Sequence, residues 1–207
     1  MKLWEQFHPF VFPDVMGAPI PVVDRALMLA SREFCTNTGI WREWSDPVTV
    51  NGTTQRFDFD FPSYSELVGT LRASVDGEHI RVLGAQFLPA DWQLPTTTFN
   101  EKALIHISMS EYMLYPMPSA GQAVSVELSL QPSMNAPGVA DDLFLNWVEE
   151  LSSGALYRLQ SSPSKPYTDL AAAARSKAAF DRGIHFAANE RFRQSATADR
   201  RVKKARI

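Results

Sequence analysis

The stretch Val124-Ser-Val-Glu-Leu-Ser-Leu130 alternates apolar and polar residues without a break. Alternation with a period of two turns one face of a β-strand toward a core and the other toward solvent. After residues 132–138, the apolar residues recur instead at helical spacing, as Phe144, Trp147, Val148 and Leu151. This change of period predicts a strand, then a linker, then a helix that begins near Asp141.

A second helix is predicted ahead of the strands, over residues 21–38. Its apolar residues follow the spacing of one helix face, at Val23, Ala26, Leu27, Ala30 and Phe34. Pro21 suits the first turn of a helix, and Gly39 suits its C-terminal end. A third helix is predicted over residues 169–193, after a turn at 161–167.

Between the first two helices, the short apolar runs keep a period of two. Asn51-Gly52 lies between residues 48–50 and 53–61, and Asp76-Gly77 lies between 71–75 and 79–83, so each pair predicts a hairpin. Residues 103–109 and 113–116 read as further strands. About six or seven short strands at such spacing predict a small antiparallel sandwich or barrel.

The predicted fold class is therefore α+β. Residues 21–43 and 139–195 are expected to form a discontinuous bundle of three main helices, because a lone helix cannot bury its apolar stripe. Residues 44–132 form an inserted β domain. Residues 1–20 contain three prolines and predict an extended lead-in, and residues 196–207 predict an extended basic tail.

Charge is distributed unevenly along the 207 residues, whose formal net charge is −3. Residues 191–207 carry seven bases and one acid, a net charge of +6. The first 190 residues carry thirteen bases and twenty-two acids, a net charge of −9. Bulk electrostatics therefore argue against nucleic-acid binding by the whole chain, while the tail could contact a partner protein or nucleic acid.

Cys35 is the single cysteine of the chain, so an intrachain disulfide is impossible and assembly in the cytoplasm is expected. The N-terminus lacks the apolar core of a signal peptide, and no stretch approaches the ~20 apolar residues of a membrane span. We therefore expect a protein without membrane contact.

Residues able to carry chemistry are sparse, and no enzymatic activity is expected. The sequence has no nucleophile elbow and no phosphate-binding or dinucleotide motif. Cys35 lies near the predicted C-terminal end of a helix, where the dipole disfavours a thiolate. The four histidines, His8, His79, His106 and His185, are too far apart for a helical metal site. No catalytic residue, metal or cofactor is predicted.

Asp58 and Asp60 are the one pair of carboxylates expected on a single strand face. Such a pair can bind a divalent ion or carry out acid–base chemistry. They alternate with Phe57, Phe59 and Phe61, so the solvent-facing side of an amphipathic strand is the simpler interpretation.

Three stretches of the chain resemble the head-to-tail adaptor (connector) proteins of tailed bacteriophages, especially short-tailed ones. The first is the helix that starts at Val22 and runs into Gly39-Ile-Trp-Arg-Glu43, with Trp41 and Arg42. The second ends in Phe57-Asp-Phe-Asp-Phe-Pro62. The third is the helix and turn from Leu151 to Tyr167, with Lys165, Pro166 and Tyr167. The resemblance covers roughly residues 20–195.

The resemblance implies a virion structural protein, assembled in the host cytoplasm and located in the neck between the portal and the tail. Its relatives form a homo-oligomeric ring, commonly of twelve subunits, that binds the portal protein and tail or nozzle proteins. Double-stranded DNA passes through the ring without sequence readout. The expected portal-docking residues lie in the tail, at Arg200, Arg201, Lys203, Lys204, Arg206 and Ile207.

Three alternatives remain open at this point. The chain could be another neck or tail ring, such as a tail-tube or stopper component. It could be a nucleic-acid-binding module that acts through the basic tail. It could also be a hydrolase or carbohydrate-binding tail component that uses Asp58 and Asp60.

Overall fold

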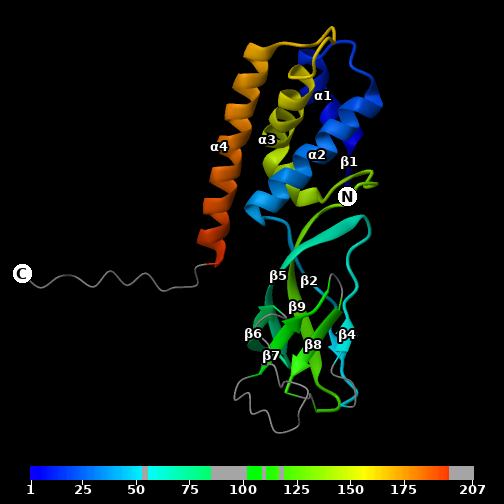
Figure 1. Ribbon diagram of the computed structural model, residues 1–207, viewed down its shortest axis with the longest axis vertical. Coiled ribbons are helices and arrows are strands. Elements are labelled where there is room, and N and C mark those ends of the chain that lie inside the picture. The colour runs from blue at the N-terminus through cyan, green and yellow to red at the C-terminus, as the bar shows by residue number, and fades with distance from the viewer. Residues whose placement is uncertain (53–55, 85–101, 109–110, 117–118, 196–207) are drawn as a thin grey trace, which may run out of the picture.

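The computed structural model describes residues 1–52, 56–84, 102–108, 111–116 and 119–195. The fold is α+β and elongated, with helices at one end and a curled sheet at the other (Figure 1). The described residues form four α-helices rather than the expected three. These are α1 (His8–Val11), α2 (Ile20–Thr38), α3 (Asp141–Gln160) and α4 (Leu170–Ser195).

The three long helices begin and end close to the residues that the sequence predicted. Pro21 lies in the first turn of α2, and Gly39 ends that helix in the left-handed conformation at φ 57°. Asp141 and Asp142 occupy the first turn of α3, where acids favour the helix dipole. The backbone of α3 leaves helical geometry at Trp147, so this helix is kinked.

The lead-in is helical, and the prediction of an extended segment for residues 1–20 was wrong. After β1 (Lys2–Leu3), it forms η1 (Trp4–Phe7), α1 and η2 (Phe12–Asp14). Pro9 and Pro13 fall in the first turns of these short helices, where a missing N–H costs nothing. Trp4 and Phe7 are buried against the molecule's own core, and the ring of Phe7 meets that of Phe144 edge-on at 4.9 Å.

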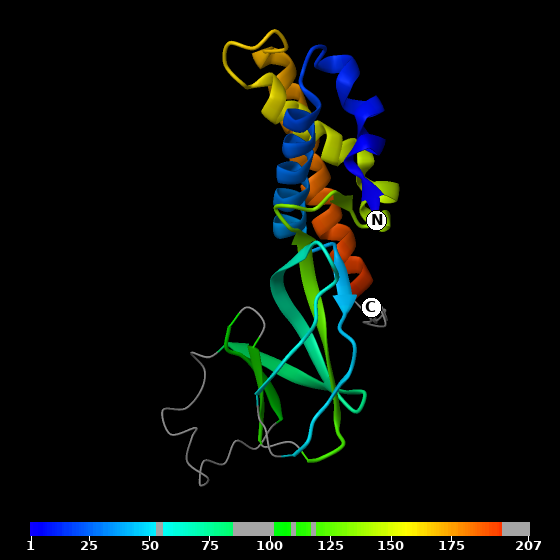
Figure 2. The ribbon, with the colours of Figure 1, turned by 90° about the vertical axis from the view of Figure 1, so that its right-hand side faces the viewer.

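Eight strands of the described residues form one sheet, in the order β2-β9-β5-β6-β7-β8-β4, with β3 also paired to β9. The sheet curls into a half-barrel (Figure 2). The strands are β2 (Arg42–Trp44), β3 (Val48–Thr49), β4 (Arg56–Asp58), β5 (Ser65–Val75), β6 (Glu78–Gly84), β7 (Ala103–His106), β8 (Glu111–Tyr115) and β9 (Ala123–Pro132). A separate pair joins β1 to β10 (Gly138–Val139).

The strand β9 and the hairpin at Asp76-Gly77, which joins β5 to β6, were predicted correctly. The hairpin predicted at Asn51-Gly52 was wrong, because β3 pairs with β9 and β4 pairs with β8 instead. The prediction of an antiparallel sandwich or barrel also needs correction, because β6 and β7 pair in parallel within one curled sheet. The residues that connect β6 to β7 include 85–101, which lie outside the described part of the chain.

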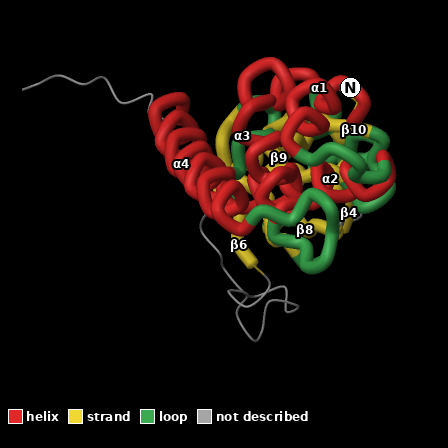
Figure 3. The backbone as a smooth tube through the Cα atoms, turned by 90° about the horizontal axis from the view of Figure 1, so that it is seen from above, coloured by secondary structure: helices red, strands yellow, loops and turns green. Residues whose placement is uncertain are grey.

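One large hydrophobic cluster of buried residues runs from the helices into the sheet, and a small second one lies between β7 and β8. The large cluster includes Phe34 of α2, Leu151 of α3 and Phe180 of α4, together with Leu128 and Leu130 of β9. Seen from above, α2 and α3 lie between α4 on one side and the N-terminal segment on the other (Figure 3). The helical end and the sheet end therefore share one hydrophobic core, and β9 contributes to it where the two ends meet.

Candidate functional site

The chain passes from α2 to β2 through Gly39, at the junction between the helical end and the sheet end. The N–H of Gly39 donates to the carbonyl of Cys35 at 2.7 Å. A side chain at this position would place its Cβ 3.0 Å from Nη1 of Arg191, which itself donates to the carbonyl of Thr38 at 3.1 Å. Glycine is thus favoured both by its positive φ and by the close approach of α4.

Trp41 and Arg42, two of the residues named in the adaptor resemblance, lie directly after this turn. Trp41 is buried, and its Nε1 donates to Oε1 of Glu43 at 2.7 Å. Its backbone carbonyl accepts the N–H of Leu130 in β9 at 2.9 Å. Trp41 therefore joins the segment that follows α2 to β9, the strand that precedes α3.

Arg42 belongs to a charge cluster around Glu127 of β9. Its Nη1 lies 3.7 Å from Glu127, and Nε of Arg72 in β5 lies 3.1 Å from the same carboxylate, at an angle outside hydrogen-bond geometry. Burial lowers the pKa of the Arg42 guanidinium, and the nearby Arg191 and Arg72 add to that effect while Glu127 opposes it. Glu127 is 9% exposed, so this cluster joins β2, β5 and β9 inside the junction.

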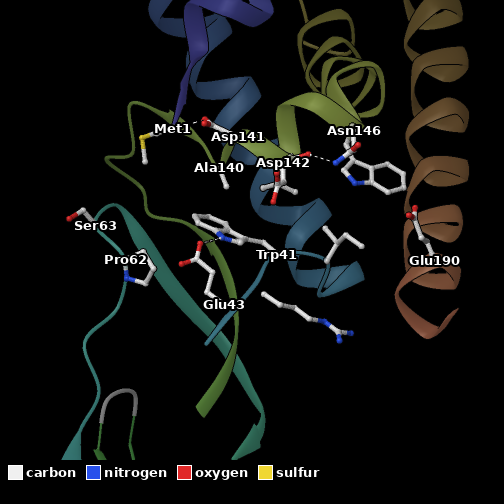
Figure 4. A pocket seen from close by; sticks show the side chains of 14 residues that line it. Met1, Trp41, Glu43, Pro62, Ser63, Ala140, Asp141, Asp142, Asn146 and Glu190 are labelled. Atoms are coloured by element: carbon white, nitrogen blue, oxygen red, sulfur yellow. Dashed lines mark hydrogen bonds and ion pairs between the residues drawn. The ribbon is translucent and has the colours of Figure 1, made fainter. Parts of the chain in front are cut away.

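A pocket of about 560 Å³ opens beside these residues, between the start of α3, the end of α4 and the chain around Trp41 (Figure 4). Its acidic wall consists of Glu43, Asp141, Asp142 and Glu190. The N-terminal amino group lies 2.8 Å from Asp141, and this hydrogen bond lowers the pKa of the Asp141 carboxyl.

Two of the four carboxylates in this pocket are engaged by neighbouring groups. The carboxylate of Glu43 is engaged by the indole of Trp41, and that of Asp141 by the terminal amino group. The described residues that line the pocket include the hydroxyl of Ser63 and no cysteine or histidine. The pocket is an acidic recess at the junction.

Lys165, Pro166 and Tyr167 lie in the turn between α3 and α4, at the far end of the helices. Tyr167 is buried, whereas Lys165 and Pro166 are exposed. Oγ1 of Thr168 donates to the carbonyl of Ser162 at 2.6 Å and accepts the N–H of Lys165 at 3.0 Å. The turn is thus closed by its own hydrogen bonds.

The first turn of α4 is capped by Asp169. Its Oδ1 accepts the N–H groups of Ala171 and Ala172, each at 2.9 Å. Asp169 thereby satisfies two of the backbone donors that a helix start leaves without a partner.

The docking residues expected in the tail, Arg200, Arg201, Lys203, Lys204, Arg206 and Ile207, lie outside the described residues. What the structure does show is where the tail begins. α4 ends at Ser195, five residues after Glu190 of the junction pocket. The C-terminal end of α4, after which the tail begins, therefore lies near the junction and not at the far end of the helices (Figure 1).

Cys35 and the histidines are the side chains that the sequence analysis weighed for nucleophilic and metal chemistry. Cys35 is fully buried, and burial raises the pKa of its thiol to about 12. His8 contacts Asp24 at 2.7 Å, and His106 stacks on Tyr112 with ring centroids 4.9 Å apart. The described residues contain no group of three or more side chains placed to hold a metal ion.

Asp58 and Asp60 are both exposed, while Phe59 between them is 2% exposed. Asp58 ends the short strand β4, and Asp60 lies beyond it. A shallow surface pocket at Asp58 also contains Arg56 and Glu111, which form an ion pair at 3.0 Å. The arrangement fits the solvent-facing side of an amphipathic segment.

Sequence reasoning missed the Arg42–Glu127–Arg72 cluster and the junction pocket. Three different strands supply the cluster, and five separate segments supply the pocket. One signal was present, because Glu127 interrupts the polar face of β9 with a charge between serines. Alternation alone marked that face as solvent-exposed, whereas Glu127 and Ser129 are buried.

No helix in the described part of the chain has the length and apolar character to cross a membrane. Compared with known proteins, the chain matches no protein-family model, and no curated protein matches it.

Proposed function

We propose that this chain is a structural subunit of a bacteriophage neck, a head-to-tail adaptor that forms a ring between the portal and the tail. In this proposal α2, α3 and α4 act as the bundle domain of the family, and residues 44–132 act as the inserted β domain. The ring would be a homo-oligomer, commonly of twelve copies in the family that the sequence resembles. Double-stranded DNA would pass through it without sequence readout.

The observation that carries the proposal is the two-ended architecture. Helices from both parts of the chain meet at one end, and the sheet encoded between them projects from the other (Figures 1 and 2). One protein can then present different surfaces to two partners along a single axis. The continuous core and the charge cluster at the junction keep those two surfaces in a defined relation.

The charge distribution supports the same function. An acidic body repels the DNA backbone, which favours passage over adhesion. The tail has the opposite charge and starts beside the junction, so it could reach a neighbouring protein as a docking arm. Its twelve residues could span at most roughly 40 Å if fully extended.

A binding experiment with purified portal rings tests the proposal. The portal protein encoded in the same genome is mixed with the full-length chain, and co-sedimentation is measured. The full chain should bind, and a chain without residues 196–207 should bind at least tenfold more weakly, since several charge-assisted contacts are lost. Absence of binding by the full chain would reject the adaptor function.

A matched variant separates the charge of the tail from its length. Arg200, Arg201, Lys203, Lys204 and Arg206 are all replaced by Gln, which keeps the chain length and removes five positive charges. Binding as weak as that of the deletion assigns docking to charge, whereas full affinity removes the basic residues from the proposal. An Asp58→Ala, Asp60→Ala variant should bind like the wild type.

The basic tail also motivates the competing function of a nucleic-acid-binding module. In that case affinity for double-stranded DNA would fall steeply with salt, because each phosphate contact releases counterions. We expect no DNA binding of the full chain at physiological salt. Imaging the particle neck by cryo-electron microscopy would separate the adaptor from another neck or tail ring.

A further inference from the structure

Two opposite sides of the helical end carry exposed apolar side chains together with charges of opposite sign. One side is the outer surface of α4, and the other is the lead-in (Figures 1 and 3). α4 packs on α3 and α2, and the lead-in packs on the same two helices from the other side. Each side therefore faces outward, with the pair of central helices between them.

The α4 face, defined by Leu170, Arg175, Ala178, Arg182 and Phe186, is one continuous stripe. Exposed residues recur every three or four positions from 171 to 189, which is the spacing of one helix face. Leu170 is 70% exposed and Phe186 is 60% exposed. The exposed residues among the described side chains of α4 include two arginines and no acid.

The lead-in face, defined by Leu3, Glu5, Phe10, Asp14 and Met16, has the complementary character. Met16 is 78% exposed, and Leu3 and Phe10 are each close to half exposed. The exposed residues of the stretch 1–20, all of which the structure describes, include two acids and no base, since Lys2 is half-buried. Large apolar groups beside opposite charges are the composition of a protein interface.

We propose that copies of this chain associate head to tail, with the α4 face of one copy against the lead-in face of the next. This inference rests on the proposed ring function and names the surfaces that build the ring. Two unlike faces on opposite sides of a subunit give a heterologous contact, which generates a ring when its rotation closes. A contact of α4 with itself would instead bring arginines together and end at a dimer.

Charge reversal with mixing tests the proposal. One full-length variant carries Arg175→Glu and Arg182→Glu, and a second carries Glu5→Lys and Asp14→Lys. Assembly size is measured by mass photometry, alone and on portal rings, after circular dichroism has shown that each variant is folded. Each variant alone should lose at least tenfold in self-association, because like charges then face each other across the interface.

An equimolar mixture of the two variants should regain the wild-type assembly. Every contact in an alternating ring then joins opposite charges, either the native pair or the reversed pair. A control variant, Arg56→Glu with Arg81→Glu on the sheet, changes the net charge equally and should assemble like the wild type. Unchanged assembly of either reversed variant, or failure of the folded mixture to recover, overturns the proposal. So does a wild-type chain that assembles neither alone nor on the portal.

Cross-linking tests the same interface independently of charge. A chain with Asp14→Cys and Arg182→Cys should form a ladder of disulfide-linked copies under mild oxidation. A chain with Ala178→Cys alone should stay uncross-linked, and Cys35 is buried and does not interfere. Dimers of the Ala178→Cys chain would show that α4 packs on itself and would overturn the proposal.

The outcomes separate this interface from the adaptor function. Portal binding without cross-linking through these faces would reject the interface and leave the adaptor function standing. Rings that form through these faces but do not bind the portal would support the interface and reject the adaptor function.

Discussion

Aromatic rings cluster at both ends of the molecule, but the cluster at the sheet end reaches the edge of the sheet, although its Phe59 and Tyr112 are buried. At the helical end, Phe34 lies 5.4 Å from the ring of Trp147 and 6.2 Å from that of Phe180, and all three are buried. At the sheet end, the ring of Phe57 lies 5.4 Å from that of Phe59, and Phe57 is only half-buried. The helical cluster joins three long helices, whereas Phe57 sits on a strand of three residues at the edge of the sheet.

This difference indicates that the interior of the helical end is closely packed and that the edge strand β4 of the sheet tolerates more local change. Gly154 shows how close the packing of the helices is, since a Cβ there would lie 2.7 Å from the ring of Phe180. Dense packing makes a core sensitive to the loss of even a few atoms. The charge cluster around Glu127 lies at the junction, and we expect it to transmit a change at one end to the other.

Truncation of the helical cluster should have the largest effect. Phe34→Ala should lower the free energy of unfolding by about 3–5 kcal/mol, because it removes a fully buried ring and leaves a cavity. Phe57→Ala at the sheet edge should cost about 1–2 kcal/mol, since only part of that ring leaves water. Urea unfolding followed by circular dichroism measures both values, and equal losses would contradict the contrast between the two ends.

Removal of the central carboxylate should come second. Glu127→Gln removes the negative charge that lies beside both Arg42 and Arg72, and should cost about 2–3 kcal/mol. This is below the figure for a fully buried pair because Arg72 is 43% exposed. The control Glu111→Gln, in an exposed pair with Arg56, should cost less than about 1 kcal/mol. If the cluster couples the two ends, the Glu127 variant should also unfold less cooperatively. A cost no greater than that of the control would remove the cluster from this role.

High pH should weaken the helical end through Cys35. Burial raises the pKa of this thiol to about 12, whereas in the unfolded chain it ionises near an ordinary value of about 8.5. Between these two pKa values the thiol ionises in the unfolded chain but not in the folded protein, and this ionisation stabilises only the unfolded state. The free energy of unfolding therefore keeps its full value below pH 8 and falls as the pH rises. The slope due to this group is about 1.4 kcal/mol per pH unit between pH 9 and 11.

The variant Cys35→Ala isolates that slope. Other groups also titrate above pH 9, so the measured quantity is the difference between wild type and variant in urea unfolding at each pH. The free energies of unfolding of wild type and variant, plotted against pH, should approach each other by about 1.4 kcal/mol per pH unit as the pH rises. Parallel curves would mean that the thiol is accessible in the folded protein.

Loss of the cap of α4 should have the smallest effect. Asp169→Ala removes the acceptor for two backbone N–H groups at the far end of the helices and should cost about 1 kcal/mol. Asp169→Asn keeps an acceptor oxygen and should be close to neutral. Hydrogen exchange should speed up in the first turn of α4 and stay unchanged in β9, whereas faster exchange in the sheet would indicate coupling over the whole length of the molecule.

The residues around the junction show what could be predicted for the candidate site. Trp41 and Arg42 were singled out by resemblance, and both lie where α2 passes into the sheet. Their partners could not be predicted, because Glu127 and Arg72 lie far away in sequence on other strands. The tail was singled out by its charge, and the structure adds the place where it begins.

The amino-acid sequence alone determined the long helices, the strand β9 and the turn at Asp76-Gly77. Each is encoded by a local signal, either apolar spacing within a few turns or a dipeptide that favours positive φ. The tertiary structure decided that β3 and β4 part to pair with β9 and β8, that β6 runs parallel to β7, and that the proline-rich lead-in is helical. Local spacing does not encode strand pairing, because the partner of a strand depends on which distant surfaces bury each other. It does not encode the conformation of a short segment either, because that conformation depends on packing against the rest of the fold.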